Sequence, residues 1–147
     1  MDRRNIFRAI FAGAAGAAVA TRASAAPARP DAAKVAYHVD DFDKAGFALG
    51  NIENHYEGMG GAANVQIALV TLGPAVRAFV AAKADPVFLR RVAKLSAQGL
   101  ELWACANTLR GMNLALGDLP PGFKTAERGG VVKLAELQSQ GFCYLRP

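Results

Sequence analysis

Residues 65–72 (VQIALVTL) constrain the fold of this chain more than any other segment. The run is apolar at nearly every position and lacks the alternation of a strand that has one face in solvent. A short, continuous apolar strand is typical of a parallel sheet that helices cover on both faces. The segment therefore predicts a buried central strand in an α/β architecture.

Other strand-like segments alternate with helix-like segments on either side of this run. The further predicted strands are 34–39, 100–104, 124–127 and 142–145. The predicted helices start in the acidic segment 40–43 and run to about Met59, then cover 73–82, 85–99, a short piece ending at Asn113, and 130–140. This order predicts a three-layer α/β/α sandwich with a mostly parallel five-stranded sheet.

Apolar residues at helical spacing identify the helix faces that we expect to be buried. The expected buried positions are Phe42, Ala45, Leu49, Ile52, Tyr56 and Met59 in the first helix, Val87, Leu89, Val92 and Leu95 in the third, and Val131, Leu134 and Leu137 in the last.

The first 25 residues have the three regions of a cleavable export signal. Arg3 and Arg4 form a twin-arginine pair, an apolar run rich in Ala and Gly follows over 9–20, and Ala23-Ser24-Ala25 fits a signal-peptidase site. The run is shorter than the ~18 residues that a membrane-spanning helix needs. Its mild hydrophobicity favours the twin-arginine route over general secretion. We expect a signal peptide over 1–25, a linker over 26–33, and a periplasmic domain over 34–147 without stable membrane association.

Composition limits the classes of partner. The net charge is +5, but the leader carries three of these charges, so the mature domain is only mildly basic. No basic run with interleaved aromatic residues occurs, which argues against nucleic-acid binding. No phosphate-binding glycine motif, serine nucleophile elbow or metal-ligand spacing is found, so we expect no cofactor and no metal.

Three residues lie at the carboxyl ends of predicted parallel strands, where ligands and reactive groups gather. They are His38, Gly73 and Cys105. Cys105 lies just before a predicted helix, so free backbone N–H groups would favour its thiolate, although a small buried packing residue is the alternative. His38 is the expected helper for a sulfur leaving group if the first and third strands are neighbours, and otherwise a structural histidine.

Four polar residues are further binding candidates with structural alternatives. Asn51 and Asn54 fall on the helix that starts at the same rim, where they either bind a ligand or serve packing. Asn107 either caps the short helix or donates to an anion. Arg110 either neutralises a sulfur oxyanion or lies solvated on the surface. Cys143 is expected to pack within the last strand rather than to bridge Cys105.

Several of these segments together resemble the DsrE/DsrF-like family of sulfur-relay proteins, which includes the DsrE and TusD types. The segments are 34–39 with His38, 51–55, 64–73, 104–110, 129–132, 137–141 and Tyr144. The resemblance covers essentially the whole predicted domain and is strongest to exported single-domain members. It implies a YchN-like fold, a trimer or hexamer, and a persulfide-carrying cysteine at the position of Cys105.

Two functions from different classes follow from these observations. The first is binding or transfer of sulfane sulfur through a persulfide on Cys105, with a sulfur donor or acceptor protein as partner. The second is a non-catalytic homo-oligomeric binding or assembly module in which Cys105 is structural. Binding of a small anion at the strand-end rim without a covalent step is a weaker third option.

Overall fold

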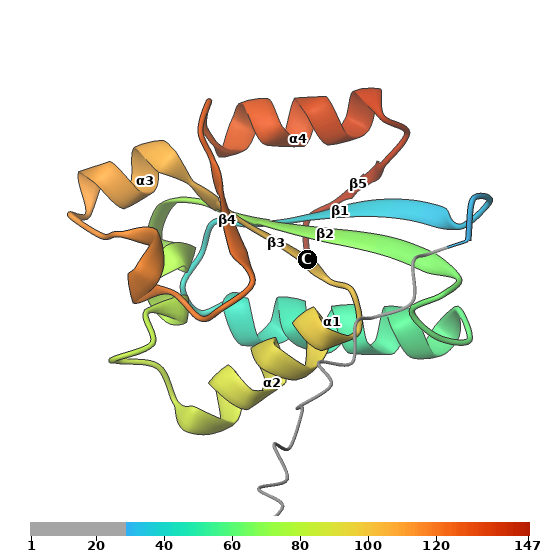
Figure 1. Cartoon of the computed structure of the whole chain (residues 1–147), viewed down its shortest axis with the longest axis horizontal. Helices are drawn as coiled ribbons and strands as arrows, with labels where there is room; N and C mark the ends of the chain where they lie inside the picture. The colour runs from blue at the N-terminus through green and yellow to red at the C-terminus, as the bar shows by residue number, and fades with distance from the viewer. Residues whose placement is uncertain (1–28) are drawn as a thin grey trace, which may run out of the picture.

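A computed structural model describes residues 29–147, which form one parallel β-sheet between helices (Figure 1). The strand order is β4-β3-β2-β1-β5, and every neighbouring pair is parallel. The strands are β1 (Ala33–Val39), β2 (Val65–Thr71), β3 (Glu101–Cys105), β4 (Phe123–Ala126) and β5 (Cys143–Leu145). The predicted strands are confirmed, with ends that shift by about one residue.

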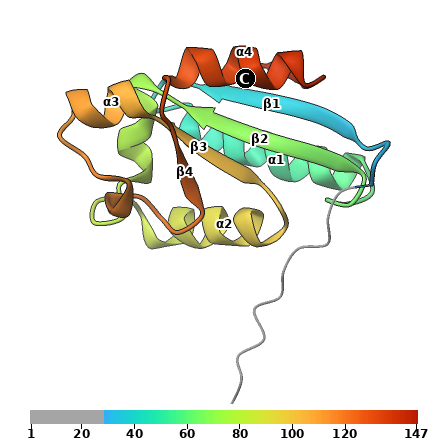
Figure 2. The ribbon, with the colours of Figure 1, turned by 45° about the horizontal axis from the view of Figure 1, so that its top comes forward.

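Helices cover both faces of this sheet, as Figure 2 shows with α4 above and with α1 and α2 below. The helices are α1 (Ala45–Gly58), α2 (Pro86–Ala97), α3 (Ala106–Gly111) and α4 (Gly130–Ser139), with short 3₁₀ segments η1 (Gly73–Phe79) and η2 (Leu116–Asp118). One apolar cluster fills the space between the sheet and α1 and α2, and a smaller one lies under α4. This arrangement is the predicted three-layer sandwich.

The middle strand β2 explains why its sequence is so continuously apolar. Val65, Ile67 and Leu69 belong to the cluster on the α1 and α2 face, whereas Ala68 and Val70 belong to the cluster under α4. Because strands lie on both sides of β2 and helices cover both of its faces, hardly any position along it meets solvent.

The first helix begins later than the acidic segment predicts. Lys44 precedes α1 and no side chain caps the helix. Asp40 instead accepts two hydrogen bonds from Arg146, at 3.0 and 2.8 Å. Phe42 therefore lies outside the helix and is 52% exposed, so the predicted burial of this residue is wrong.

Three further predicted core positions face solvent. Met59 follows the end of α1 and is exposed, while Val87 and Val131 lie in the first turns of α2 and α4 and are 62% and 70% exposed. The segment predicted as a helix over 73–82 is a 3₁₀ turn that ends at Phe79. Helical spacing of apolar residues therefore overestimates how far the buried face of each helix extends toward its ends.

The predicted signal peptide and most of the predicted linker fall on residues 1–28, outside the described residues. Within residues 29–147, no helix combines the length and apolar character needed to span a membrane.

Candidate functional site

Cys105 is the last residue of β3 and the residue that precedes α3. Its side chain lies on the α4 face of the sheet, since Leu102 and Ala104, at alternating positions of the same strand, belong to the opposite cluster. The side chain is 5% exposed. The cysteine thus lies at the carboxyl end of a central strand, beneath the start of α4.

Hydrogen-bond donors from two helices converge on the Cys105 sulfur. Burial raises the pKa of this thiol, but the neighbouring backbone N–H groups of Thr108, Gly130 and Asn107 and the Thr108 hydroxyl lower it by more. The net result is a pKa below the ordinary value of 9.0. Donors that are already aimed at the sulfur stabilise its thiolate, which is the nucleophilic form.

Two glycines allow α4 to approach the cysteine this closely. A Cβ atom at Gly130 would lie 3.3 Å from the Cys105 Cβ and 3.0 Å from a methyl carbon of Leu72. Gly129 has a φ of 99°, and a Cβ there would lie 2.9 Å from the Asn107 amide nitrogen. A larger residue at Gly130 would push the N-terminus of α4 away from the sulfur, and one at Gly129 would strain the backbone because of the positive φ.

Thr108 joins the cysteine to the turn that follows β2. The Gly73 N–H donates to the Thr108 hydroxyl oxygen at 2.9 Å, and the same hydroxyl helps to lower the pKa of Cys105. The predicted neighbourhood of Gly73 and Cys105 is therefore present, with Thr108 as the link between them.

Asn107 and Arg110 lie on α3 beside the cysteine. Both side chains are exposed, and Arg110 donates a hydrogen bond to the Asn107 side-chain oxygen. No side chain caps α3, so the capping role considered for Asn107 is not present. These two residues form the solvent side of the site.

His38 does not belong to this group of residues. The expected adjacency of the first and third strands is wrong, because β2 lies between β1 and β3 and separates them by about 10 Å. His38 Nδ1 hydrogen-bonds the Tyr144 hydroxyl at 2.7 Å, and His38 Nε2 is buried without a partner among residues 29–147. Burial lowers the pKa of His38. The negative charge of Asp40 raises this pKa, and the positive charge of Arg146 lowers it further.

Asn51 and Asn54 also lie away from the cysteine. Both are on α1, which covers the face of the sheet opposite to α4. Asn54 borders a polar hollow that Gly61 and Ala62 line, and these residues precede β2. Asn54 therefore lies toward the amino end of the sheet, away from the rim that holds Cys105, and Asn51 lies in the middle of α1 on the opposite face of the sheet.

Cys143 lies exposed in β5, the edge strand next to β1. Both cysteines are free, as expected. The expectation that Cys143 packs in the core or at an edge is wrong, because its side chain is exposed on the edge strand. Within residues 29–147, no three His, Cys, Asp or Glu side chains are grouped in a way that would hold a metal ion.

Thr108 and Gly130 are the site residues that sequence reasoning did not select. A hydroxyl residue three positions after a cysteine at a helix start was a usable signal for Thr108. The contribution of Gly130 depends on how α4 packs on β3, and no local pattern encodes that contact.

Comparisons with known proteins agree with this fold. A model of the DsrE/DsrF-like family matches residues 18–147. The structure is similar to that of MTH1491 from Methanobacterium thermoautotrophicum, a protein of unknown function, with 25% identity and a TM-score of 0.69 over 78% of this chain and 99% of that one. It also shares its fold with the ychN protein from E. coli, at 17% identity and a TM-score of 0.56 over 79% and 99% of the two chains. No curated protein matches the chain. Because the family model covers most of its length, the chain belongs to the DsrE/DsrF-like family.

Proposed function

We propose that this protein carries sulfane sulfur as a persulfide on Cys105. The observation that supports this function best is the convergence of three backbone N–H groups and the Thr108 hydroxyl on the sulfur, with the lowered pKa that results. The family is associated generally with sulfur relay, which agrees with a reactive cysteine.

The proposed loading step requires no added oxidant or reductant. The Cys105 thiolate attacks the sulfane sulfur of a donor, a new S–S bond forms to Sγ, and the bond between that sulfur and the rest of the donor breaks. The donor remnant leaves with the electron pair. In the unloading step an acceptor thiolate attacks the outer sulfur and Cys105 leaves as a thiolate, which the same N–H groups stabilise.

We further propose that the domain is exported to the periplasm and works as a homo-oligomer, a trimer or hexamer, with a sulfur donor or acceptor protein as partner. The leader sequence supports export. Phe42, Phe47, Val87 and Val131 are each more than half exposed, which supports burial of helix faces between subunits. Light scattering of the mature protein tests the assembly, and a monomer at micromolar concentration would contradict it.

The same exposed apolar side chains favour a second candidate, an assembly module in which Cys105 only packs. The low exposure of Cys105 is consistent with this alternative. Under it, the thiol would resist modification in the folded protein.

Intact mass spectrometry after treatment with polysulfide distinguishes the two functions. The mature protein is compared with Cys105→Ser and Cys143→Ser, because the exposed Cys143 supplies a second accessible thiol. We expect Cys143→Ser to gain sulfur masses that reductant removes. If Cys143→Ser gains no sulfur while the unmodified protein and Cys105→Ser do, only Cys143 reacts. Cys105 is then a packing residue and the carrier function is wrong.

Thr108 provides a finer test of the donor arrangement. In the Cys143→Ser background, Thr108→Val keeps the backbone N–H but removes the hydroxyl, so it should raise the pKa of Cys105 and leave the Gly73 N–H without its acceptor. We expect a stability loss of about 1–3 kcal/mol. Thr108→Ser should restore both properties. The pH dependence of Cys105 alkylation measures the effect, and identical profiles for Val and Ser would contradict it.

A further inference from the structure

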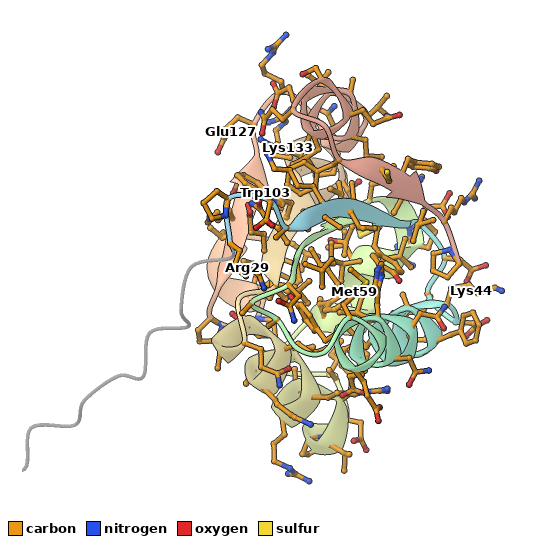
Figure 3. The ribbon with its side chains drawn as sticks, turned by 90° about the vertical axis from the view of Figure 1, so that its right-hand side faces the viewer. Arg29, Lys44, Met59, Trp103, Glu127 and Lys133 are labelled. Atoms are coloured by element: carbon orange, nitrogen blue, oxygen red, sulfur yellow. The ribbon has the colours of Figure 1, made fainter. Side chains whose placement is uncertain are left out.

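A small pocket of about 190 Å³ lies beside the Cys105 site, at the edge of the sheet that β4 forms. Trp103, Ala126, Gly129, Lys133 and Glu136 are among the residues that line it. This volume corresponds to about six water molecules, which is room for a small anion but not for a folded segment of a partner. Figure 3 shows Trp103, Lys133 and Glu127 gathered close to α4.

The indole ring of Trp103 holds two ammonium groups near it. The Nζ atoms of Lys133 and Lys124 lie 4.0 and 5.2 Å from the ring centroid. Cation–π attraction keeps both charges at this end of the sheet. Two lysines that would otherwise repel each other are thus brought to the same aromatic side chain.

Arg128 and Lys133 line the pocket together with the carboxylates of Glu127 and Glu136, and the ammonium group of the nearby Lys124 makes the net charge around it positive. Glu136 is already paired, at 3.0 Å with Lys133 and at 3.2 Å with Arg128. Lys124 has no carboxylate partner among the described residues. The indole Nε1–H of Trp103 is buried and also lacks an acceptor in that part of the chain. A ligand with oxygen acceptors would stabilise the unpaired ammonium charge of Lys124.

The pocket shares its wall with the cysteine. Trp103 and Cys105 are two residues apart on β3 and face the same side, so their Cα atoms are about 7 Å apart. Gly129, which lines the pocket, precedes Gly130, and a Cβ at Gly130 would lie 3.3 Å from the Cys105 Cβ. A small molecule anchored at Trp103 therefore has its other end close to the sulfur.

We propose that this pocket binds the oxyanion head of a small sulfane-sulfur donor and directs its sulfane sulfur to Cys105. The donor role rests on the proposed persulfide function. With thiosulfate, the Cys105 thiolate attacks the outer sulfur, the Sγ–S bond forms, the S–S bond of thiosulfate breaks, and sulfite leaves with the electron pair. A low-molecular-weight persulfide with a carboxylate offers the same chemistry and leaves as a thiolate.

Binding is measured without transfer by the fluorescence of Trp103, the single tryptophan of the chain. Cys105→Ser protein is titrated with thiosulfate and, separately, with acetate at constant ionic strength, which distinguishes a sulfonate head from a carboxylate head. We expect a saturable change that weakens at least about tenfold in Lys124→Gln/Lys133→Gln. Lys83→Gln/Arg90→Gln, which removes two exposed cations elsewhere, should bind as before. A change that does not saturate for either anion, or that is equal in all three proteins, would overturn the pocket.

Transfer is measured by the rate of Cys105 loading in Cys143→Ser, with thiosulfate and with diallyl trisulfide, an uncharged sulfane-sulfur donor. Loss of both lysines should slow loading from thiosulfate at least about tenfold and change the trisulfide rate less than twofold. Equal slowing with both donors, or no slowing, would overturn the pocket while the persulfide function stands. Saturable binding with no loading from either donor would instead overturn the persulfide function and keep the oxyanion site.

Discussion

The two cysteines of this protein lie toward opposite edges of one sheet and have contrasting surroundings. Cys105 ends β3 and is nearly inaccessible, yet N–H groups from α3 and α4 point at its sulfur. Cys143 lies on the edge strand β5, exposed to solvent, and among residues 29–147 this strand pairs with β1 alone. Access to reagents and stabilisation of a thiolate are therefore separate properties that the fold assigns to different residues.

The contrast shows what a parallel sheet does for a cysteine at the carboxyl end of an inner strand. Helices start at this rim, so their free N–H groups are available to an anion there. An edge position such as that of Cys143 offers neighbouring strand atoms on one side only. We therefore attribute the expected chemistry of Cys105 to its donors rather than to its exposure.

The largest effect on this contrast should come from Gly130→Ala. The new Cβ would lie 3.0 Å from Leu72 and 3.3 Å from the Cys105 Cβ, so α4 must move. We expect a loss of about 1–3 kcal/mol in unfolding free energy and a higher pKa of Cys105. Urea unfolding and the pH dependence of alkylation measure the two effects. Gly46→Ala is the matched control, because its Cβ meets no atom within 4 Å and Ala favours helix. Equal stability of the two variants would contradict the close approach.

A smaller effect should appear in the pH dependence of stability. Because the pKa of folded Cys105 is below the unfolded value, near 9.0, the unfolded state binds more protons between these two values. The contribution of the thiolate is thus complete above pH 9.0 and is lost as the pH falls through the folded pKa. We expect the stability difference between Cys143→Ser and Cys105→Ala/Cys143→Ser to grow as the pH rises through this range, by about 1.4 kcal/mol for each unit of pKa shift. A difference that is constant with pH would contradict a stabilised thiolate.

The smallest effect should come from Cys143→Ser. An exposed edge residue without a disulfide should change the unfolding free energy by no more than about 0.5 kcal/mol. The alkylation profile of Cys105, identified by peptide mass spectrometry, should be the same with and without this change. A shifted alkylation profile of Cys105 would show that the two cysteines are coupled and would contradict their separate roles.

The architecture could be predicted from the sequence because burial constrains the type of side chain at every position of a strand or helix. The continuous apolar character of β2 follows from cover on both faces, and the Asp85-Pro86 pair starts α2 as predicted, with Asp85 accepting from the Val87 N–H at 2.6 Å. The predictions fail where a local sequence pattern does not show which residues the tertiary packing buries. Phe42 and Val131 fit a helical spacing, but neither position faces the core.

The candidate site could be predicted only in part, for a related reason. Cys105, Gly73 and Asn107 meet because each follows a strand that ends at one rim, which is a local rule. The distance between His38 and Cys105 depends on strand order, and the sequence does not state that β2 separates their strands. The N–H of Gly130 depends on the packing of α4, which joins residues that are distant along the chain.

The pairing of β5 with β1 sets the order in which this chain completes its fold. The hydrogen bond between His38 and Tyr144 joins residues 106 positions apart, and β5 is the last of the five strands in chain order. Until β5 pairs with it, the outer edge of β1 is open to pairing with other chains. Contacts of this sequence separation also slow folding. Loss of β5 would leave that edge uncovered, so this strand protects the folding protein from aggregation.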